Sequence, residues 1–370
     1  MKILLYLMAI MSLMLANVHK DADTASCKKC HPTITKEFEE SMHKHSSIYN
    51  DKIHKAVWDL HPAKAKGDYK CSKCHTPNAK TKEEQTQGIT CLTCHTIKSI
   101  TKDSKSNINN YNGEKKSFYS AEAGREKEKV VYKTTTSWWG NKTTVGSAYH
   151  DIDYTNKDFY TGNVCMGCHS HKQNSNQFDV CRIEEDGAKN EKENCITCHM
   201  PKIEGSATTV RISQKHSFHG FSGARKNSKM LAKYVDIDFV KNSKGFKITV
   251  ENKAPHNLLT HPLRVVKLKT NIFRDSKKIE LKTHTFVKII GTDSKPTMPW
   301  LATEVVKDTM IKAKEKRVID FEENLKSGDK IEVILGFYVV NPKALKKLNL
   351  EGDKEISEFK ILKSQNFSVE

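Results

Sequence analysis

The sequence has few hydrophobic residues for a chain of its length. Hydrophobic residues make up 37% of the 370 residues and charged residues make up 29%, which is lean for a large apolar core. After residue 18, no apolar run is long enough to cross a membrane as a helix. Acidic residues are fewer than basic ones, 44 against 62, and the formal net charge is +18. Part of the interior is therefore expected to be filled by something other than side chains.

Cysteine is nearly absent outside one repeated pattern, Cys-x-x-Cys-His. Five such runs lie in the first 200 residues and use ten of the 11 cysteines. In c-type haem attachment, the two thiols bind the porphyrin vinyl groups and the histidine becomes the proximal iron ligand. Chance would give about 0.015 such runs, so the sequence predicts five covalently bound haem c groups. The predicted thioether residues are Cys27, Cys30, Cys71, Cys74, Cys91, Cys94, Cys165, Cys168, Cys195 and Cys198, and the predicted proximal iron ligands are His31, His75, His95, His169 and His199.

Two other uses of Cys-x-x-Cys pairs agree less well with the sequence. A structural zinc ion takes two pairs, whereas five is an odd number, and zinc gives no reason for the histidine after each second cysteine. A thioredoxin-type redox pair occurs once, near a βαβ unit. Cys181 is the one cysteine outside the runs. We expect it to be buried and inert, with an intermolecular disulfide or an iron ligand as alternatives.

The N-terminus and the charge predict where the protein works. Met1 and Lys2 precede an uncharged apolar stretch over residues 3–18, which is short for a membrane span and typical of a signal peptide over residues 1–18. An uncleaved anchor is the alternative. Covalent haem is attached outside the cytoplasm, so we expect the periplasm of a Gram-negative bacterium. The scattered lysines are expected to bind haem propionates, acidic redox partner proteins or an anionic membrane surface rather than nucleic acid.

The predicted fold class is α+β, with two domains after the signal peptide. Residues 19–205 are expected to form a pentahaem domain of helices and loops with little regular structure, whose core is the apolar porphyrins. The fourth and fifth haem motifs are close in sequence, as are the second and third, and each pair is expected to be in contact. Residues 206–370 contain alternating, β-branched runs at 247–251, 263–268, 278–281, 317–321 and 330–340, which predict a β-sandwich domain.

The polar segment 100–148 is expected to be an excursion of loops with one hairpin. Trp138 and Trp139 near its end could cover a haem edge, and ordinary packing is the slightly favoured alternative. Twelve histidines lie outside the motifs. Because two axial imidazoles keep iron low-spin and lower its potential, this abundance predicts bis-His haems.

The motif segments at 27–46, 71–95, 149–169 and 194–201 resemble the multihaem cytochromes c. This superfamily holds the tetrahaem cytochrome of ammonia oxidisers, hydroxylamine oxidoreductase and pentahaem nitrite reductase. The resemblance is looser at 215–220 and 255–261. By position it implies that the distal iron ligands include His43, His150, His216 and His256, with His54 or His61 as the fifth if a fifth exists.

The sequence departs from the enzymes of that superfamily. It has no Cys-x-x-Cys-Lys run, which carries the catalytic haem of pentahaem nitrite reductase, and it has five motifs where hydroxylamine oxidoreductase has eight haems. We therefore predict a periplasmic pentahaem electron carrier of an anaerobic-type respiratory chain, without catalytic residues. Its partners would be a quinol-side donor, a reductase or another cytochrome. The alternatives are a multihaem reductase of a nitrogen or sulfur oxyanion with one open haem, and a β domain that docks another subunit.

Overall fold

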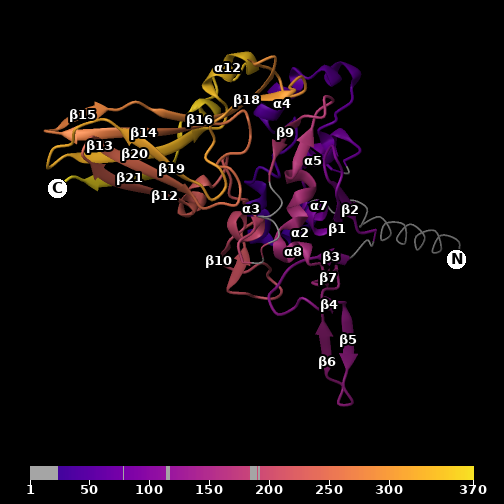
Figure 1. Ribbon diagram of the computed structural model, residues 1–370. Coiled ribbons are helices and arrows are strands. Elements are labelled where there is room, and N and C mark those ends of the chain that lie inside the picture. The colour runs from indigo at the N-terminus through magenta and orange to yellow at the C-terminus, as the bar shows by residue number, and fades with distance from the viewer. Residues whose placement is uncertain (1–23, 78, 114–116, 184–189, 191) are drawn as a thin grey trace.

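A computed structural model describes residues 24–77, 79–113, 117–183, 190 and 192–370. Figure 1 shows long strands at one end of the molecule and short helices with small hairpins at the other. The predicted mixture of helix and strand is confirmed. The predicted signal peptide at 1–18 lies outside the described residues. Within the described residues, no helix is long and apolar enough to span a membrane.

The haem motifs lie in a region of very short helices. None of these helices in the described residues exceeds eight residues, so they are too short to be stable on their own. The helices are α2 (Thr24–Lys28), α3 (Pro32–Glu39), α4 (Lys52–Asp59), α5 (Ser72–His75), α6 (Lys82–Gln85), α7 (Cys91–His95), α8 (Asp158–Thr161), α9 (Met166–His169) and α11 (Cys195–His199), with 3₁₀ turns η1 (Pro62–Lys66) and η2 (Asn163–Cys165).

Small sheets run between these helices, more than the sequence predicted for this region. β1 pairs with β2, β5 with β6, β8 with β9 and β10 with β11, and β7 lies between β3 and β4. The predicted domain boundary at 205/206 falls inside the β10–β11 hairpin, and the division itself stays a prediction. The strands are β1 (Ile97–Thr101), β2 (Ile108–Tyr111), β3 (Ser117–Tyr119), β4 (Lys129–Val130), β5 (Lys133–Thr136), β6 (Lys142–Val145), β7 (Asp151–Asp153), β8 (His171–Gln173), β9 (Asp179–Arg182), β10 (Lys202–Glu204) and β11 (Lys215–Ser217).

The C-terminal region is built from two antiparallel sheets. The 3₁₀ helix η3 (Ser228–Tyr234) leads into a three-stranded sheet in the order β12-β13-β19, and the larger sheet has the order β17-β16-β14-β20-β21 with β15 on β14 and β18 on β16. All five predicted β-runs lie on these strands. The remaining elements are β12 (Val235–Asn242), β13 (Gly245–Asn252), β14 (Val265–Arg274), β15 (Lys277–Glu280), β16 (His284–Thr292), β17 (Lys295–Pro296), β18 (Glu304–Asp308), β19 (Lys316–Phe321), β20 (Lys330–Tyr338), α12 (Pro342–Leu348), α13 (Lys354–Ser357) and β21 (Lys360–Ser368).

One hydrophobic core joins the two sheets. Residues alternate along β13, where Phe246, Ile248 and Val250 are fully buried, and along β20, where Ile331 and Leu335 are fully buried. These side chains belong to a single cluster. Period-2 alternation places one face of each strand against the other sheet. The same alternation in the sequence predicted these strands.

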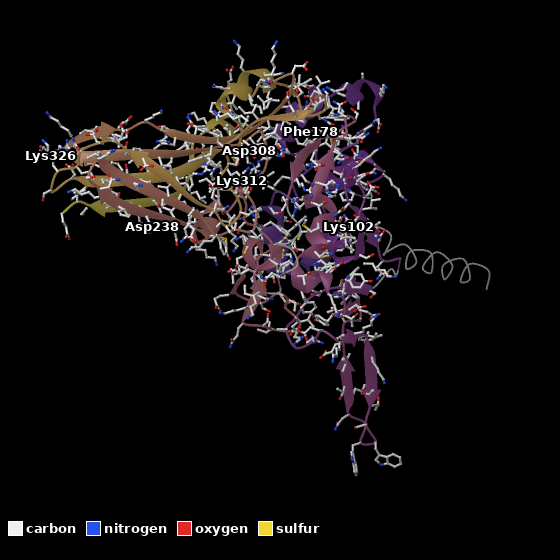
Figure 2. All side chains as sticks on the ribbon, viewed as in Figure 1. Lys102, Phe178, Asp238, Asp308, Lys312 and Lys326 are labelled. Atoms are coloured by element: carbon white, nitrogen blue, oxygen red, sulfur yellow. The ribbon has the colours of Figure 1, made fainter. Side chains whose placement is uncertain are left out.

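The helix α4 of the haem-motif region packs against this core. Its Ile53 and Val57 pack against the hydrophobic cluster of the two sheets, and the Lys52 ammonium donates to Asp353 at 2.6 Å. In Figure 2, Asp308 and Lys312, which form an ion pair, lie on the side of the β region that faces the short helices, whereas Lys326 lies at its far end. The β region therefore contacts the motif region through one end.

Candidate haem centres

Each of the five motifs contains a helical turn. In the first motif the His31 N–H donates to the Cys27 carbonyl at 2.9 Å, and in the second the His75 N–H donates to the Cys71 carbonyl at 3.1 Å. Residues at i, i+3 and i+4 of a helical turn share one face. Both thiols and the imidazole of a motif are thus on the same side, as attachment of one porphyrin requires.

The backbone orients four of the five motif imidazoles. In each of these four, ring Nδ1 donates to a carbonyl from a distant segment, which leaves Nε2 with its lone pair for a metal. The hydrogen bond also makes the imidazole a more basic ligand. The distances are 2.8 Å for His31 to Ala207, 2.9 Å for His75 to Ser46, 2.7 Å for His95 to Tyr119 and 2.6 Å for His199 to Ser222.

Four motif imidazoles face a second imidazole at a distance that suits an iron between them. Two imidazoles on opposite sides of one metal have nitrogen–metal distances of about 2.0–2.1 Å, which puts their ring centroids roughly 6 Å apart. Interplanar angles are 18–28° in three pairs and 62° in the pair of His43 with His169. The centroid distances are 6.3 Å for His31 and His150, 6.1 Å for His43 and His169, 6.4 Å for His95 and His219, and 6.1 Å for His199 and His256.

The second imidazoles are in a state that can bind metal. Burial lowers the pKa of His43 to about 3, with a further contribution from His169, and burial also lowers the pKa of His219 to about 3. Both rings are therefore neutral, the form in which imidazole is a ligand. The Nδ1 atom of His43 is buried and has no hydrogen-bond partner among the described residues, and Phe221 packs edge-on against this ring at 4.0 Å between centroids.

The contacts of His216 do not favour its predicted role as a distal ligand, which stays a prediction. Its Nδ1 donates to the Gly205 carbonyl at 2.8 Å, and its Nε2 lies 2.8 Å from a Glu37 carboxylate oxygen. Both ring nitrogens are thus engaged within the protein. The second Glu37 oxygen accepts the backbone N–H of His219 at 2.8 Å. Glu37 and His216 therefore position the segment that presents His219, which is three residues further along the same His-Ser-Phe-His run.

His54 and His61 are not placed opposite a motif histidine. The rings of His54 and His75 have centroids 3.9 Å apart, too close for an iron between them. Both Nδ1 atoms lie 2.9 Å from the Ser46 carbonyl, so His54 stands beside the motif imidazole. The Nδ1 of His61 accepts the Ala63 N–H at 3.1 Å at the start of η1. These contacts do not favour either residue as the fifth distal ligand, and that assignment stays a prediction.

His261 is a further histidine close enough to the second motif to interact electrostatically with His75. Protein atoms surround the ring, and this burial lowers its pKa to about 3, as do Arg264 and His75. The residue is nevertheless accessible to solvent. A ring that lines a space enclosed by protein is both surrounded by protein atoms and accessible to solvent. Its Nδ1 accepts the Leu263 N–H at 3.2 Å. Burial, and then Arg225, also lower the pKa of Arg264 to about 10. His261 was not among the predicted distal ligands, although it lies in the 255–261 segment that resembles a ligand loop.

Thiol contacts link motifs that are far apart in sequence. The side chains of Cys27 and Cys91 are in hydrogen-bond contact, as are those of Cys74 and Cys168. The first motif therefore adjoins the third, and the second adjoins the fourth. The fourth also adjoins the fifth through Cys165 and Cys195, as expected from their spacing. The predicted contact between the second and third motifs stays a prediction.

Cys181 lies outside the five motifs but close enough to the second to interact electrostatically with Cys74. It is on β9, where it pairs with Lys172 of β8, and burial raises the pKa of its thiol. Within the described residues, no three His, Cys, Asp or Glu side chains gather as a metal site.

The chain is similar to known multihaem cytochromes. Residues 26–96 match the family described as cytochrome c554 and c-prime. The crystal structure of a penta-heme cytochrome c552 from Thermochromatium tepidum shares the fold, with a TM-score of 0.71 at 19% sequence identity, and the match covers 94% of this chain and 99% of that chain. Curated protein sequences give no significant match.

The five motifs, their helical turns and these comparisons point to one class: the chain resembles the multihaem cytochromes c, which bind haem c covalently, and it shares the fold of one of them. More particularly, its first three motifs lie in the segment that matches the cytochrome c554 and c-prime family. The sequence resemblance to multihaem cytochromes c is thereby confirmed.

Proposed function

We propose that the chain is a pentahaem electron-transfer protein with mainly bis-His haems, working in a periplasmic respiratory chain. Haem c supplies a one-electron iron couple when it is bound. The ten motif cysteines would hold the porphyrins and the five motif histidines would be the proximal ligands. Four distal ligands are proposed from the opposed pairs. These are His150 for the iron of His31, His43 for that of His169, His219 for that of His95 and His256 for that of His199.

The opposed imidazole pairs are the observation that carries this proposal. An iron held between two imidazoles keeps no open position for a substrate, which suits electron transfer better than catalysis. The carbonyl hydrogen bonds to four motif imidazoles would make these ligands more basic and lower the potentials. The thiol contacts between motifs support close packing of neighbouring haems, as transfer within one protein requires.

The location and the partners follow from the class and the charge. A cytochrome works with redox partner proteins, and proteins of this class are typically exported. The net charge of +18 favours partners with acidic surfaces, because complementary charge raises the rate of encounter. A quinol-side donor and a terminal reductase or another cytochrome are the partner classes we propose.

The electron paramagnetic resonance spectrum of the oxidised holoprotein tests the proposal. We expect low-spin ferric signals from the four irons with opposed imidazoles. Mass spectrometry of the same sample should show five added haem masses. High-spin signals from two or more irons, or fewer than five haems, would contradict the proposed ligand set.

A second candidate function is reduction of an oxyanion at one haem, because the second motif differs from the other four. Among the described residues, the ring nearest His75 is His54 beside it, and no ring pair near 6 Å involves His75. His261 accepts the Leu263 N–H on Nδ1, so its Nε2 would carry a proton and could donate to a molecule on the iron. The Arg264 guanidinium close by would attract an anion. This arrangement suits reduction of a nitrogen or sulfur oxyanion at one open haem.

His261→Ala separates the two candidates. If His261 binds the iron, the wild-type protein is low-spin throughout, and the variant gains a high-spin signal from one of five irons. If the haem is open, the wild-type protein already shows that signal, and nitrite or hydroxylamine shifts it. His61→Ala is a matched control, because His61 is hydrogen-bonded at η1 and should leave every iron unchanged.

A further inference from the structure

A two-stranded hairpin projects from the motif region. Residues 131–149, here named the arm, contain β5 and β6 and connect β4 to β7. Figure 1 shows the β5–β6 hairpin extending away from the rest of the molecule. Every residue of both strands is exposed, with Lys133 opposite Val145 and Thr136 opposite Lys142. The two strands of the arm are therefore open to solvent along their whole length.

The tip of the arm is held by its own backbone. The Ser137 N–H donates to the Asn141 carbonyl at 2.8 Å, and the Gly140 N–H donates to the Ser137 carbonyl at 2.9 Å. Gly140 has φ of 78°, a left-handed value that suits glycine in a short hairpin loop. These bonds involve neither indole of the tip, so the two tryptophans are not needed for its shape.

Those tryptophans are almost completely open to solvent. Trp138 is 95% exposed and Trp139 is 85% exposed. The sequence suggested that these tryptophans cover a haem edge or pack in the interior. Within the described residues, they neither lie against a motif nor pack internally. Two large amphipathic rings side by side at a protruding tip form an apolar patch of the kind that marks an interaction site.

The charge of the arm indicates the occupant. From residue 129 to residue 150 the sequence contains no acidic residue, and the charged residues within the arm are Lys133 and Lys142. Tryptophan prefers the headgroup level of a bilayer, and lysine beside it is attracted to anionic lipid. A protein partner would need a shaped pocket for both rings, whereas a lipid interface accepts them without one.

We propose that the arm is a peripheral membrane anchor, in which Trp138 and Trp139 insert into the headgroup region of an anionic bilayer and Lys133 and Lys142 face its surface. The arm is followed directly by His150, whose ring faces His31 at 6.3 Å. Contact with the bilayer therefore holds the first motif at the membrane side of the protein. This orientation rests on the proposed function, whereas the binding itself does not.

Vesicle co-sedimentation of the holoprotein tests the anchor, with haem absorbance in the pellet as the readout. Vesicles of phosphatidylcholine with a quarter phosphatidylglycerol are compared with pure phosphatidylcholine. We expect wild-type protein to bind the anionic vesicles. W138A/W139A should weaken binding roughly tenfold or more, because binding scales with the apolar area inserted. K133A/K142A should remove the preference for anionic lipid.

The matched control is V210A/I212A, since Val210 and Ile212 are 75% and 76% exposed on another segment, and it should bind as wild type does. Unchanged haem spectra will show that each variant is folded. Equal binding by W138A/W139A and wild type, or no binding by wild type, overturns the proposal. The proposal is also overturned if wild type is a dimer in solution, W138A/W139A is a monomer, and the two bind vesicles equally. The occupant of the arm would then be a second copy of the chain.

Discussion

Replacing His219 and His216 one at a time gives opposite results if the proposed ligand set is right. His219→Ala removes the imidazole that faces His95 at 6.4 Å. His216→Ala removes a ring whose two nitrogens are bonded to Gly205 and Glu37. The first change should therefore alter an iron, and the second should alter stability.

The sizes of both effects follow from the structure. His219→Ala opens one of five irons, so a high-spin ferric signal should account for about one fifth of the total iron. His216→Ala leaves the half-enclosed Glu37 carboxylate without its partner at 2.8 Å. Loss of one partner of a buried hydrogen bond costs about 1–3 kcal/mol. We expect this cost in the free energy of unfolding, with all five irons unchanged.

Quantitative paramagnetic resonance of the oxidised protein measures the first effect, and thermal unfolding followed by circular dichroism measures the second. Glu37→Ala is an informative third variant, because it frees both the His216 ring and the His219 backbone N–H. It should lower stability and broaden the low-spin signal of one haem. A high-spin iron in His216→Ala together with an unaltered spectrum in His219→Ala would refute the assignment.

Three further predictions concern the rest of the chain. Phe246→Ala, in the fully buried core of the two sheets, should cost about 3–5 kcal/mol of unfolding free energy, while Val240→Ala, 59% exposed, should change it little. The Arg274 hydrogen bond lowers the pKa of Asp329, so its stabilising contribution is complete above the unfolded value of about 3.9 and is lost as the pH falls through the lower folded value. Asp329→Asn should therefore reduce the loss of melting temperature seen in wild type on going from about pH 5 to pH 3. Cys181→Ser should retain all haem by mass spectrometry, and loss of one haem in this variant would contradict the place given to Cys181.

The parts of the protein that follow local patterns were predictable from its sequence. The five motifs are covalent signatures within five residues, and strands such as β13 and β20 show the alternation that a two-sheet core requires. The proposed partners across the irons depend instead on contacts between distant segments. The proposed choice of His219 over His216 rests on Glu37, which is 179 residues before His216. The position of His54 depends on the Ser46 carbonyl that it shares with His75.

The carbonyl groups behind the motif histidines also bear on the order of maturation. Covalent attachment needs little more than a local run of five residues, whereas the acceptors for His31 and His199 are the carbonyls of Ala207 and Ser222. Both acceptors are translated after the fifth motif. If the proposed haems are bound, a chain whose haems are already attached therefore reaches its final midpoint potentials only when this later stretch has docked, so residues translated after all five motifs complete the surroundings of the first haem.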